Sequence, residues 1–589
     1  MDSTEEMAPV TETEVTCDYL IVGAGTACLS FVDTLLDLRN DITFVIVDRN
    51  SDPGGHWTKA YPFVRLHQPS CSYGVRSLPL GKLDKNGKEV YDTDERATAK
   101  EICEYYEKVV KNLVATGRVR TYFNSNYEGE ATDTDGSISK IHSDPASKVT
   151  HIIRNQNGVL IHVKCTKLVR SESNVIVPSM RTGVPFPVDK SVVNTIPLNE
   201  LPKYIGKTQQ KYLVIGAGKS GIDALIYLLE DAKVDPDQIT WIVSQSAWYF
   251  MRDGIALTPK PGKSFWKNAT KVFFEPLGAA KSADEAFLLM EKAGSLGRVH
   301  PDDGHFPRVF RGANMTYTDL ANLRRIKNVL KNMGRVTSIT SNEIIFQNGA
   351  HSVPFSPIDT LVVDCMTEDT YGYFSFEEDF QFFNPHKIRL GPAVAIFNPS
   401  HTSTMIAFLE AEFSDSAAGD AVKNSFCCFP RGRELKKNST QQLLMLYFYY
   451  ESKTNLNFGK YKPYSRFVLG DRTDMFQPDH HGGLLGLLWA FFGPTKLHKK
   501  TETFVERMEN GSLEDFPIGT LTGANEVDPE KFKAVKRKIP KVASSKSTTA
   551  NAKKSIDNGD LPKKKKGLGS LFCCRTADGI QTNMHYLFL

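Results

Sequence analysis

The sequence has no long uninterrupted apolar run. Its most apolar stretch, 482–493 (GGLLGLLWAFFG), is shorter than the roughly 20 residues that a membrane-crossing helix needs. Residues 1–15 are acidic and have neither the positively charged start nor the apolar centre of a secretory signal. We therefore expect a cytoplasmic protein.

Paired cysteine motifs are also missing. None of the ten cysteines forms a C-x-x-C or C-x4-C motif, and two pairs are directly adjacent, Cys427-Cys428 and Cys573-Cys574. Vicinal cysteines are poor disulfide partners, and no run has the spacing of a metal site. The sequence predicts no dithiol redox centre and no metal.

The body of the chain lacks an excess of positive charge. The net charge is +4, but residues 531–566 hold thirteen Lys or Arg against Asp557 and Asp560, so the remainder is net negative. We expect no nucleic-acid partner, and any attraction to anionic surfaces is confined to the tail.

Four lysines, Lys563–Lys566, shortly precede Cys573 and Cys574 in this tail. A solvated, disordered tail is the favoured interpretation. The alternative is a peripheral membrane contact through acylated cysteines and basic charge, which would make the protein membrane-associated.

A strand–turn–helix pattern is present near the start. The apolar run Tyr19–Val22 predicts a buried parallel strand that enters the turn 23–28 (GAGTAC), after which apolar residues recur at helical spacing. Gly23 allows a tight turn, and Gly25 lets the backbone approach a pyrophosphate held by the N–H groups of the helix's first turn. Cys28 stands where a third Gly or Ala is usual, so we expect a sulfur in the helix–strand contact.

A second apolar run, 42–47, ends at Asp48, whose carboxylate can accept hydrogen bonds from ribose hydroxyls. A second glycine motif follows much later. The strand 212–215 leads into 216–221 (GAGKSG), complete in Gly216, Gly218 and Gly221. Two such motifs, too far apart for one strand–helix–strand unit, indicate two nucleotide-binding folds, one for FAD and one for a nicotinamide dinucleotide.

On these motifs, together with 54–57 (GGHW) and Tyr61-Pro62-x-x-Arg65-x-His67, residues 17–415 resemble the two-dinucleotide-fold flavoproteins, and within them the class B flavin monooxygenases of the flavin-containing and Baeyer–Villiger types. The resemblance implies an α/β protein with two Rossmann-like domains. It also implies FAD and NADH or NADPH as cofactors, and a small-molecule substrate that is oxygenated after the flavin is reduced.

The predicted organisation is a split FAD domain interrupted by an NAD(P) domain. The boundaries are a disordered N-terminus (1–16), the first part of the FAD domain (17–190), the NAD(P) domain (207–320), the second part of the FAD domain (321–418), a mostly helical region (419–528) and a disordered basic tail (529–589). We further expect a helix with a basic face over Thr318–Met333 and a strand over Thr360–Cys365 that returns to the FAD sheet.

Candidate site residues follow from the motifs and the resemblance. Arg65 and His67 are the catalytic candidates, since His67 stands where the Baeyer–Villiger pattern has Asp and an imidazole can donate to a flavin edge. The cofactor-binding candidates are Gly23, Gly25, Asp48, Arg49, Gly55, His56, Trp57, Gln68, Gly216, Gly218, Ser220 and Gly221.

Three departures from the family pattern keep other functions open. The monooxygenase fingerprint has no good match before the second glycine motif, where Asn194 or Thr195 stands in place of its His. Ser244-Gln245 follow the second nucleotide strand without an Arg for a 2′-phosphate, which leaves NADH, or NADPH held by a cation such as Arg252. The late Ala-Thr-Gly turn of the family is replaced by Asp364-Cys365-Met366-Thr367. The alternatives are an NAD(P)H:flavin dehydrogenase or oxidase, and a non-catalytic nucleotide-binding protein.

Overall fold

The computed structural model describes most of the chain up to residue 537. The described residues are 13–131 (except 88, 91 and 93), 147–171, 183–207, 211–255, 268, 270–347 (except 303), 351–366, 380–391, 398–430, 440–468, 471–473 and 499–537 (except 518, 520 and 522–524). Within them, no helix is long and apolar enough to cross a membrane. No group of His, Cys, Asp or Glu in the same residues could hold a metal ion.

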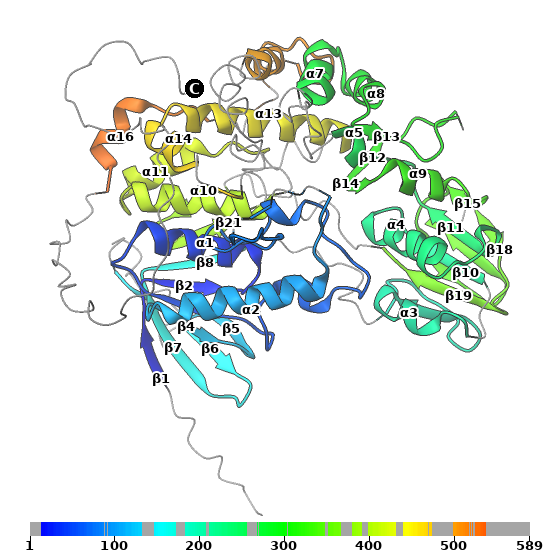
Figure 1. Cartoon of the computed structure of the whole chain (residues 1–589), viewed down its shortest axis with the longest axis horizontal. Helices are drawn as coiled ribbons and strands as arrows, with labels where there is room; N and C mark the ends of the chain where they lie inside the picture. Colours follow the sequence, from blue (N-terminus) through cyan, green and yellow to red (C-terminus); the bar gives the residue numbers. More distant parts are fainter. Residues whose placement is uncertain are drawn as a thin grey trace, which may run out of the picture.

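The first nucleotide fold is built on a six-stranded sheet in the order β20-β21-β8-β2-β3-β4, parallel except for β20 (Figure 1). Its strands are β2 (Tyr19–Val22), β3 (Phe44–Val47), β4 (Val119–Tyr122), β8 (Lys167–Ser171), β20 (Phe383–Asn384) and β21 (Lys387–Leu390). The helices associated with it are α1 (Thr26–Leu38), α2 (Ala99–Ala115) and α10 (Pro399–Glu412).

The central strands are apolar throughout because both faces of the sheet are covered. Tyr19 and Ile21 of β2 pack with the helices, whereas Leu20 faces a second, four-stranded sheet. That sheet has the order β1-β7-β6-β5 and contains β1 (Thr13–Thr16), β5 (Ser125–Glu130), β6 (Val149–Asn155) and β7 (Leu160–Cys165). A tight turn at 155–158 joins the antiparallel strands β6 and β7. The expected disorder of 1–16 is wrong for residues 13–16, because β1 pairs with β7.

The second fold repeats this plan on a five-stranded parallel sheet, β15-β11-β10-β19-β9. Its strands are β9 (Asn194–Pro197), β10 (Lys211–Ile215), β11 (Ile239–Val243), β15 (Asn328–Lys331) and β19 (Thr360–Asp364). Helix α4 (Lys219–Ile226) follows β10 and continues as a π-helical turn, 227–231. Leu213 and Ile215 face the antiparallel strands β16 (Val336–Ile339), β17 (Glu343–Phe346) and β18 (Ser352–Pro354).

Two sequence predictions about this region are wrong. The strand at 360–364 does not return to the first sheet, because it pairs in parallel with β10, so the second sheet extends well beyond residue 320. The helix expected over Thr318–Met333 ends at Leu323 as α9 (Tyr317–Leu323), and residues 328–331 form the edge strand β15 beside β11. Pairing with an existing sheet edge overrides the helical pattern of this segment.

The described part of the C-terminal region is mostly helical, and Figure 1 shows α13 (Thr440–Gly459) lying near the top of the molecule. At one end α13 contacts α11 (Ala417–Phe426) and α14 (Lys462–Val468). At the other it contacts α8 (Ala283–Ala293) and β14 (Val309–Met315). Other described elements after residue 246 include β12 (Ala247–Met251), α5 (Arg252–Ile255), α7 (Glu275–Ala279), β13 (Leu296–Gly297) and α16 (Pro529–Val535).

The disorder predicted from residue 529 onward is wrong for residues 529–537. Phe532 and Val535 of α16 are buried, and Arg537 forms an ion pair with Asp415 at 2.8 Å. The earlier part of this segment is polar enough to suggest disorder, but its two apolar residues pack against the first fold's core. The lysine run and the cysteine pair near the C-terminus lie outside the described residues.

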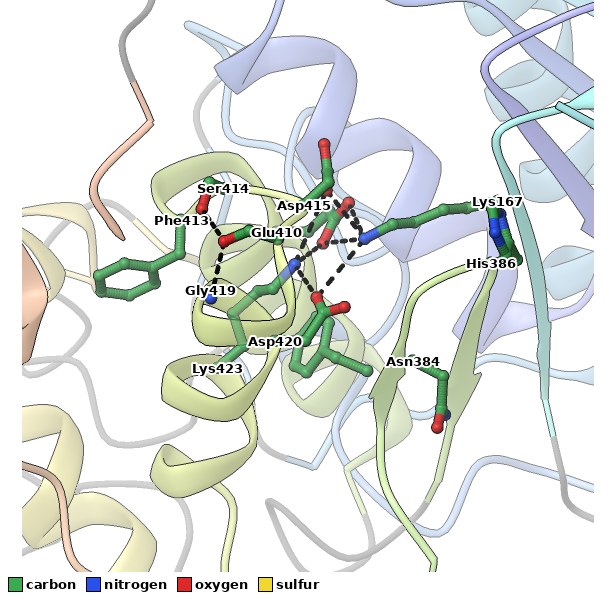
Figure 2. Close-up of polar contacts among 12 residues, drawn as sticks. Lys167, Asn384, His386, Glu410, Phe413, Ser414, Asp415, Gly419, Asp420 and Lys423 are labelled. Atoms are coloured by element: carbon green, nitrogen blue, oxygen red, sulfur yellow. Dashed lines mark hydrogen bonds and ion pairs between the residues drawn. The ribbon is translucent and has the colours of Figure 1, made fainter. Parts of the chain in front are cut away.

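A buried ion network joins α10, α11 and β8 (Figure 2). The ammonium groups of Lys167 and Lys423 both contact Glu410, at 2.9 and 2.7 Å, and each also lies within ion-pair distance of Asp415 and Asp420. Both lysine side chains are almost fully buried, so their charges are balanced by carboxylates rather than by water.

Removing one partner should therefore destabilise the protein. We expect Lys423→Met to lower the free energy of unfolding by about 3–5 kcal/mol, because Glu410 and Asp420 would be left buried without their closest cation. Chemical denaturation followed by circular dichroism measures the change. Lys531→Met, which removes an exposed cation on α16, is the control and should cost little. Equal midpoints for the two variants would contradict the role of the network.

Candidate active site between two nucleotide folds

The first glycine turn is held by contacts between backbones. Gly23 has a φ of +107°, and its N–H donates to Val47 at 2.8 Å. Gly54 donates to the carbonyl of Ala24 at 2.9 Å, which brings Gly55 against Gly25. A Cβ placed on Gly55 would lie only 3.0 Å from the Cα of Gly25. Glycine is favoured at position 55 because its φ is positive and the two backbone segments approach each other closely there.

Asp48 supports the same turn. Its Oδ2 accepts a 2.6 Å hydrogen bond from the N–H of Ala24, and its Oδ1 accepts from the N–H of Asn50 at 2.8 Å. The expected position of the carboxylate at the end of β3 is confirmed by these contacts, while its contact with a ribose stays a prediction. Cys28 lies against the turn as expected, with its Sγ 3.5 Å from the carbonyl of Val22, and burial raises its pKa to about 12.

A cluster of hydroxyl groups lies at the start of α1. Tyr106 donates to Thr26 Oγ1 at 2.7 Å, Tyr73 is hydrogen-bonded to the same Thr26, and Trp57 donates to Tyr73 at 2.7 Å. Trp57 is therefore buried beneath the turn, whereas the neighbouring residue His56 is exposed. The sequence carried no signal for this cluster, because its members are distant in the chain.

The second glycine turn uses a different set of close contacts. A Cβ on Gly221 would lie 2.2 Å from the carbonyl oxygen of Gly216, and one on Gly216 would lie 2.7 Å from the carbonyl oxygen of Cys365. Gly218, by contrast, has no atom within 4 Å of its Cβ position. The outer glycines serve packing, and the central one leaves open space beside the backbone.

Helices α1 and α4 share one feature at their N-termini. Their N-cap residues are Gly25 and Gly218, and neither helix has a side-chain hydrogen bond to its first turn. The other helices of eight or more residues with a described cap, α2, α8, α10 and α11, are all capped by a Thr, Ser or Asn side chain. The first-turn N–H groups of α1 and α4 are thus left for a different acceptor, as a bound pyrophosphate would be.

The two folds meet along a seam lined by the segment 61–68. The Tyr61 hydroxyl donates to Asp223 of α4 at 2.6 Å, and Asp223 is in turn paired with Lys219. Phe63 stacks on Tyr227 with ring centroids 4.4 Å apart. Burial, and then the charge of Asp223, raise the pKa of Tyr61. The only sequence signal here was the spacing of Lys219 and Asp223, four residues apart on one helix. That spacing predicts their ion pair but not the hydrogen bond with Tyr61.

The remaining candidates are spread along this segment. His67 is half-buried at the seam, and burial followed by the nearby charges of Lys219 and Arg252 lowers its pKa well below the usual range. Arg65 is exposed and donates to the carbonyl of Arg96 at 3.0 Å. Gln68 donates to the carbonyl of Ser72 at 3.3 Å. Of the other two candidates, Ser220 is half-buried in the first turn of α4, and Arg49 is exposed beside Asp48.

The C-terminal region reaches the first fold near this site. Arg472 is buried and donates to the carbonyls of Tyr73, Val75 and Cys71 at 2.9–3.0 Å, besides its ion pair with Glu89. The Oδ2 of Asp471 lies 3.0 Å from the Nδ1 of His401, in the first turn of α10. These contacts fix the loop that follows the 61–68 segment, and nothing in the local sequence marked them.

Comparison with known proteins identifies relatives that are similar to most of this chain. No family model matches it. Uncharacterized proteins from Mycobacterium tuberculosis and Mycobacterium bovis are 34% identical over 429 residues, which is 70% of this chain and 69% of theirs. The chain belongs to the same protein family as these mycobacterial proteins.

A more distant relative carries a named activity. The FAD-dependent monooxygenase DEP4 of Alternaria brassicicola is 26% identical over 245 residues, or 41% of this chain and 36% of that protein. The resemblance to flavin monooxygenases is thereby confirmed at the level of sequence similarity. Among solved structures, a steroid monooxygenase bound to NADP aligns with 67% of this chain and 85% of its own, at 15% identity and a TM-score of 0.45.

The glycines of the second turn differ in what a side chain would do. We expect Gly221→Ala to destabilise the protein by about 1–3 kcal/mol, because the added Cβ overlaps the Gly216 carbonyl, although alanine favours helix more than glycine does. Gly218→Ser should leave stability unchanged, since the space is open and serine is a good N-cap. Thermal unfolding of the two variants tests this, and a loss of stability in Gly218→Ser alone would refute it.

Proposed function

We propose that the chain is an FAD-dependent oxidoreductase of the monooxygenase type, reduced by NADPH or NADH and acting on a small organic molecule. The observation that carries the proposal is the pair of helix N-termini at Gly25 and Gly218, each open to an anion and each following an interior strand of its own sheet. The named activity of the more distant relative supports the same conclusion.

The first fold is the one proposed to hold FAD. The N–H groups at the start of α1 would bind the pyrophosphate, Gly25 and Gly55 keep side chains out of its path, and Asp48 faces the turn from the end of β3. FAD, when bound, accepts a hydride from the nicotinamide and makes the electrons available to oxygen. The buried Thr26, Tyr73 and Tyr106 hydroxyls hold the turn in place from below.

The second fold is proposed to bind the nicotinamide dinucleotide. The N–H groups of α4 lie beside the open space at Gly218, and the Lys219 ammonium is held in the same turn by Asp223. Tyr61 then links this turn to the first fold. Because a hydride has to pass between the two cofactors, a fixed orientation of the folds at this contact favours the reaction.

His67 is the residue of the seam best suited to act on a reactant. Its ring has no hydrogen-bond partner among the described residues and is partly accessible, and its lowered pKa keeps it neutral near pH 7. A neutral imidazole can both donate and accept a hydrogen bond. The role proposed for Arg65 is to shape the loop through the Arg96 carbonyl, besides its predicted contact with reactants.

The proposal is tested first by the colour and redox behaviour of the purified protein. We expect flavin absorbance in the protein as isolated, or after addition of FAD, and bleaching by NADPH or NADH without oxygen. In air, a monooxygenase with its substrate should oxidise NAD(P)H with little release of hydrogen peroxide, whereas an oxidase releases about one peroxide per NAD(P)H. A colourless protein that takes up no FAD would sink the proposal.

Two glycine variants separate the two nucleotide sites. Gly25→Val should abolish flavin retention, because a branched side chain would displace Gly55 and fill the approach to the α1 amides. Gly218→Val should retain flavin but slow its reduction by NAD(P)H. Gly183→Val, at another open position, is the matched control. Flavin content and the rate of anaerobic reduction are the measurements. Normal reduction of Gly218→Val would exclude the second fold as the dinucleotide site.

A further inference from the structure

Polar groups from two distant segments of the chain meet at the carbonyl oxygen of His67. Arg96, just before α2, donates its Nε to this oxygen at 3.5 Å, and Asn314 of β14 donates its Nδ2 at 3.3 Å. The Oδ1 of Asn314 accepts from Arg252 Nη1, also at 3.3 Å. Two guanidinium groups, from segments that precede α2 and follow β12, are therefore brought to the same point of the seam.

The positive charge at this point is only partly balanced. Arg252 is paired with Asp319 at 3.2 Å, but its buried Nε has no hydrogen-bond partner. Arg96 has no carboxylate within ion-pair distance among the described residues, and its other hydrogen bond is to the carbonyl of Asp94 at 3.0 Å. Burial, and then the charge of Arg252, lower the pKa of Arg96 to about 10.

The carboxylates nearby already have other hydrogen-bond or ion-pair partners. Asp319 also accepts from the N–H of Thr316 at the start of α9, Asp253 accepts from the N–H of Tyr317, and Asp223 is held by Lys219 and Tyr61. Two partly buried guanidinium groups lie near His67, whose ring has no hydrogen-bond partner among the described residues. They favour an anion with two oxygens, which a planar guanidinium binds through paired hydrogen bonds.

We propose that Arg96, Arg252 and His67 form a seam site that binds the carboxylate of an organic acid, which is the substrate oxidised by this protein. This inference rests on the proposed function and specifies its substrate class. A carboxylate is favoured over the pyrophosphate of a dinucleotide because each pyrophosphate has its own open amides, at Gly25 and Gly218. The measurement with NADP⁺ below decides between a carboxylate and the 2′-phosphate of NADPH. The site also lies at the segment 61–68, which contacts α4 of the second fold through Tyr61.

The test uses the flavin-loaded protein and pairs of acids and amides of equal shape. Benzoate, phenylacetate and hexanoate are compared with benzamide, phenylacetamide and hexanamide, by calorimetry and by the perturbation of the flavin spectrum. We expect at least one acid to bind at least about tenfold more tightly than its amide, since a hydrogen bond to a charged group is worth that much or more. Equal binding of every pair would overturn the inference.

Variants then locate the binding. Arg96→Gln and Arg252→Gln should each lower the affinity for the acid by about 10- to 100-fold and leave the affinity for the amide unchanged. Lys327→Gln, which removes an exposed cation of the second fold, is the control and should change neither. Unaltered acid binding in both arginine variants would place the site elsewhere. The comparison of acid with amide in the unaltered protein remains decisive if a variant fails to fold.

A measurement with NADP⁺ shows whether the site binds a carboxylate or a nucleotide phosphate. Acid binding is repeated with saturating NADP⁺, and both ligands should bind together. Mutual exclusion, or a loss of NADP⁺ affinity in the arginine variants, would assign the cations to a nucleotide phosphate and overturn the inference. If the proposed function is wrong, the protein will bind no flavin. Calorimetry of the flavin-free protein would then still measure the binding of acids at the seam site.

Discussion

The whole arrangement depends on the close approach of backbone to backbone at the two glycine turns. Gly55 lies directly against Gly25, and Gly221 lies against the carbonyl of Gly216. These contacts set where each helix starts relative to the sheet, and they leave the first-turn amides without side-chain caps. A helix start that is neither capped nor filled costs stability, which a bound diphosphate would restore.

Each turn belongs to the same kind of layered unit. A mainly parallel sheet is covered on one face by helices and on the other by a mainly antiparallel sheet, so its strands are apolar on both faces. The two units are joined by direct contacts, of which the Tyr61–Asp223 hydrogen bond and the Phe63–Tyr227 stack are the clearest. The segment 61–68 therefore serves both as the lining of one site and as the boundary of the other.

The C-terminal region adds a third layer of constraint. Arg472 holds the loop 70–75 through its carbonyls, and the buried lysines 167 and 423 bind the carboxylates of α10 and α11. Arg537 contributes to the same network from the end of the described chain. Buried charges of this kind are stable only when every partner is present, so the region and the first fold depend on each other.

Local patterns in the sequence determined the strand–turn–helix units, because the glycine spacing, the apolar strands and the helical periodicity act over few residues. Tyr19–Val22, α1 and the strand at 212–215 were correctly predicted on that basis. Tertiary structure alone decided that residues 328–331 and 360–364 join the second sheet, since a strand's partner is chosen by the edge it meets. It also decided which charges meet at the seam, because Arg96, Arg252 and Asn314 come from segments whose separation along the chain carries no information about their distance in space.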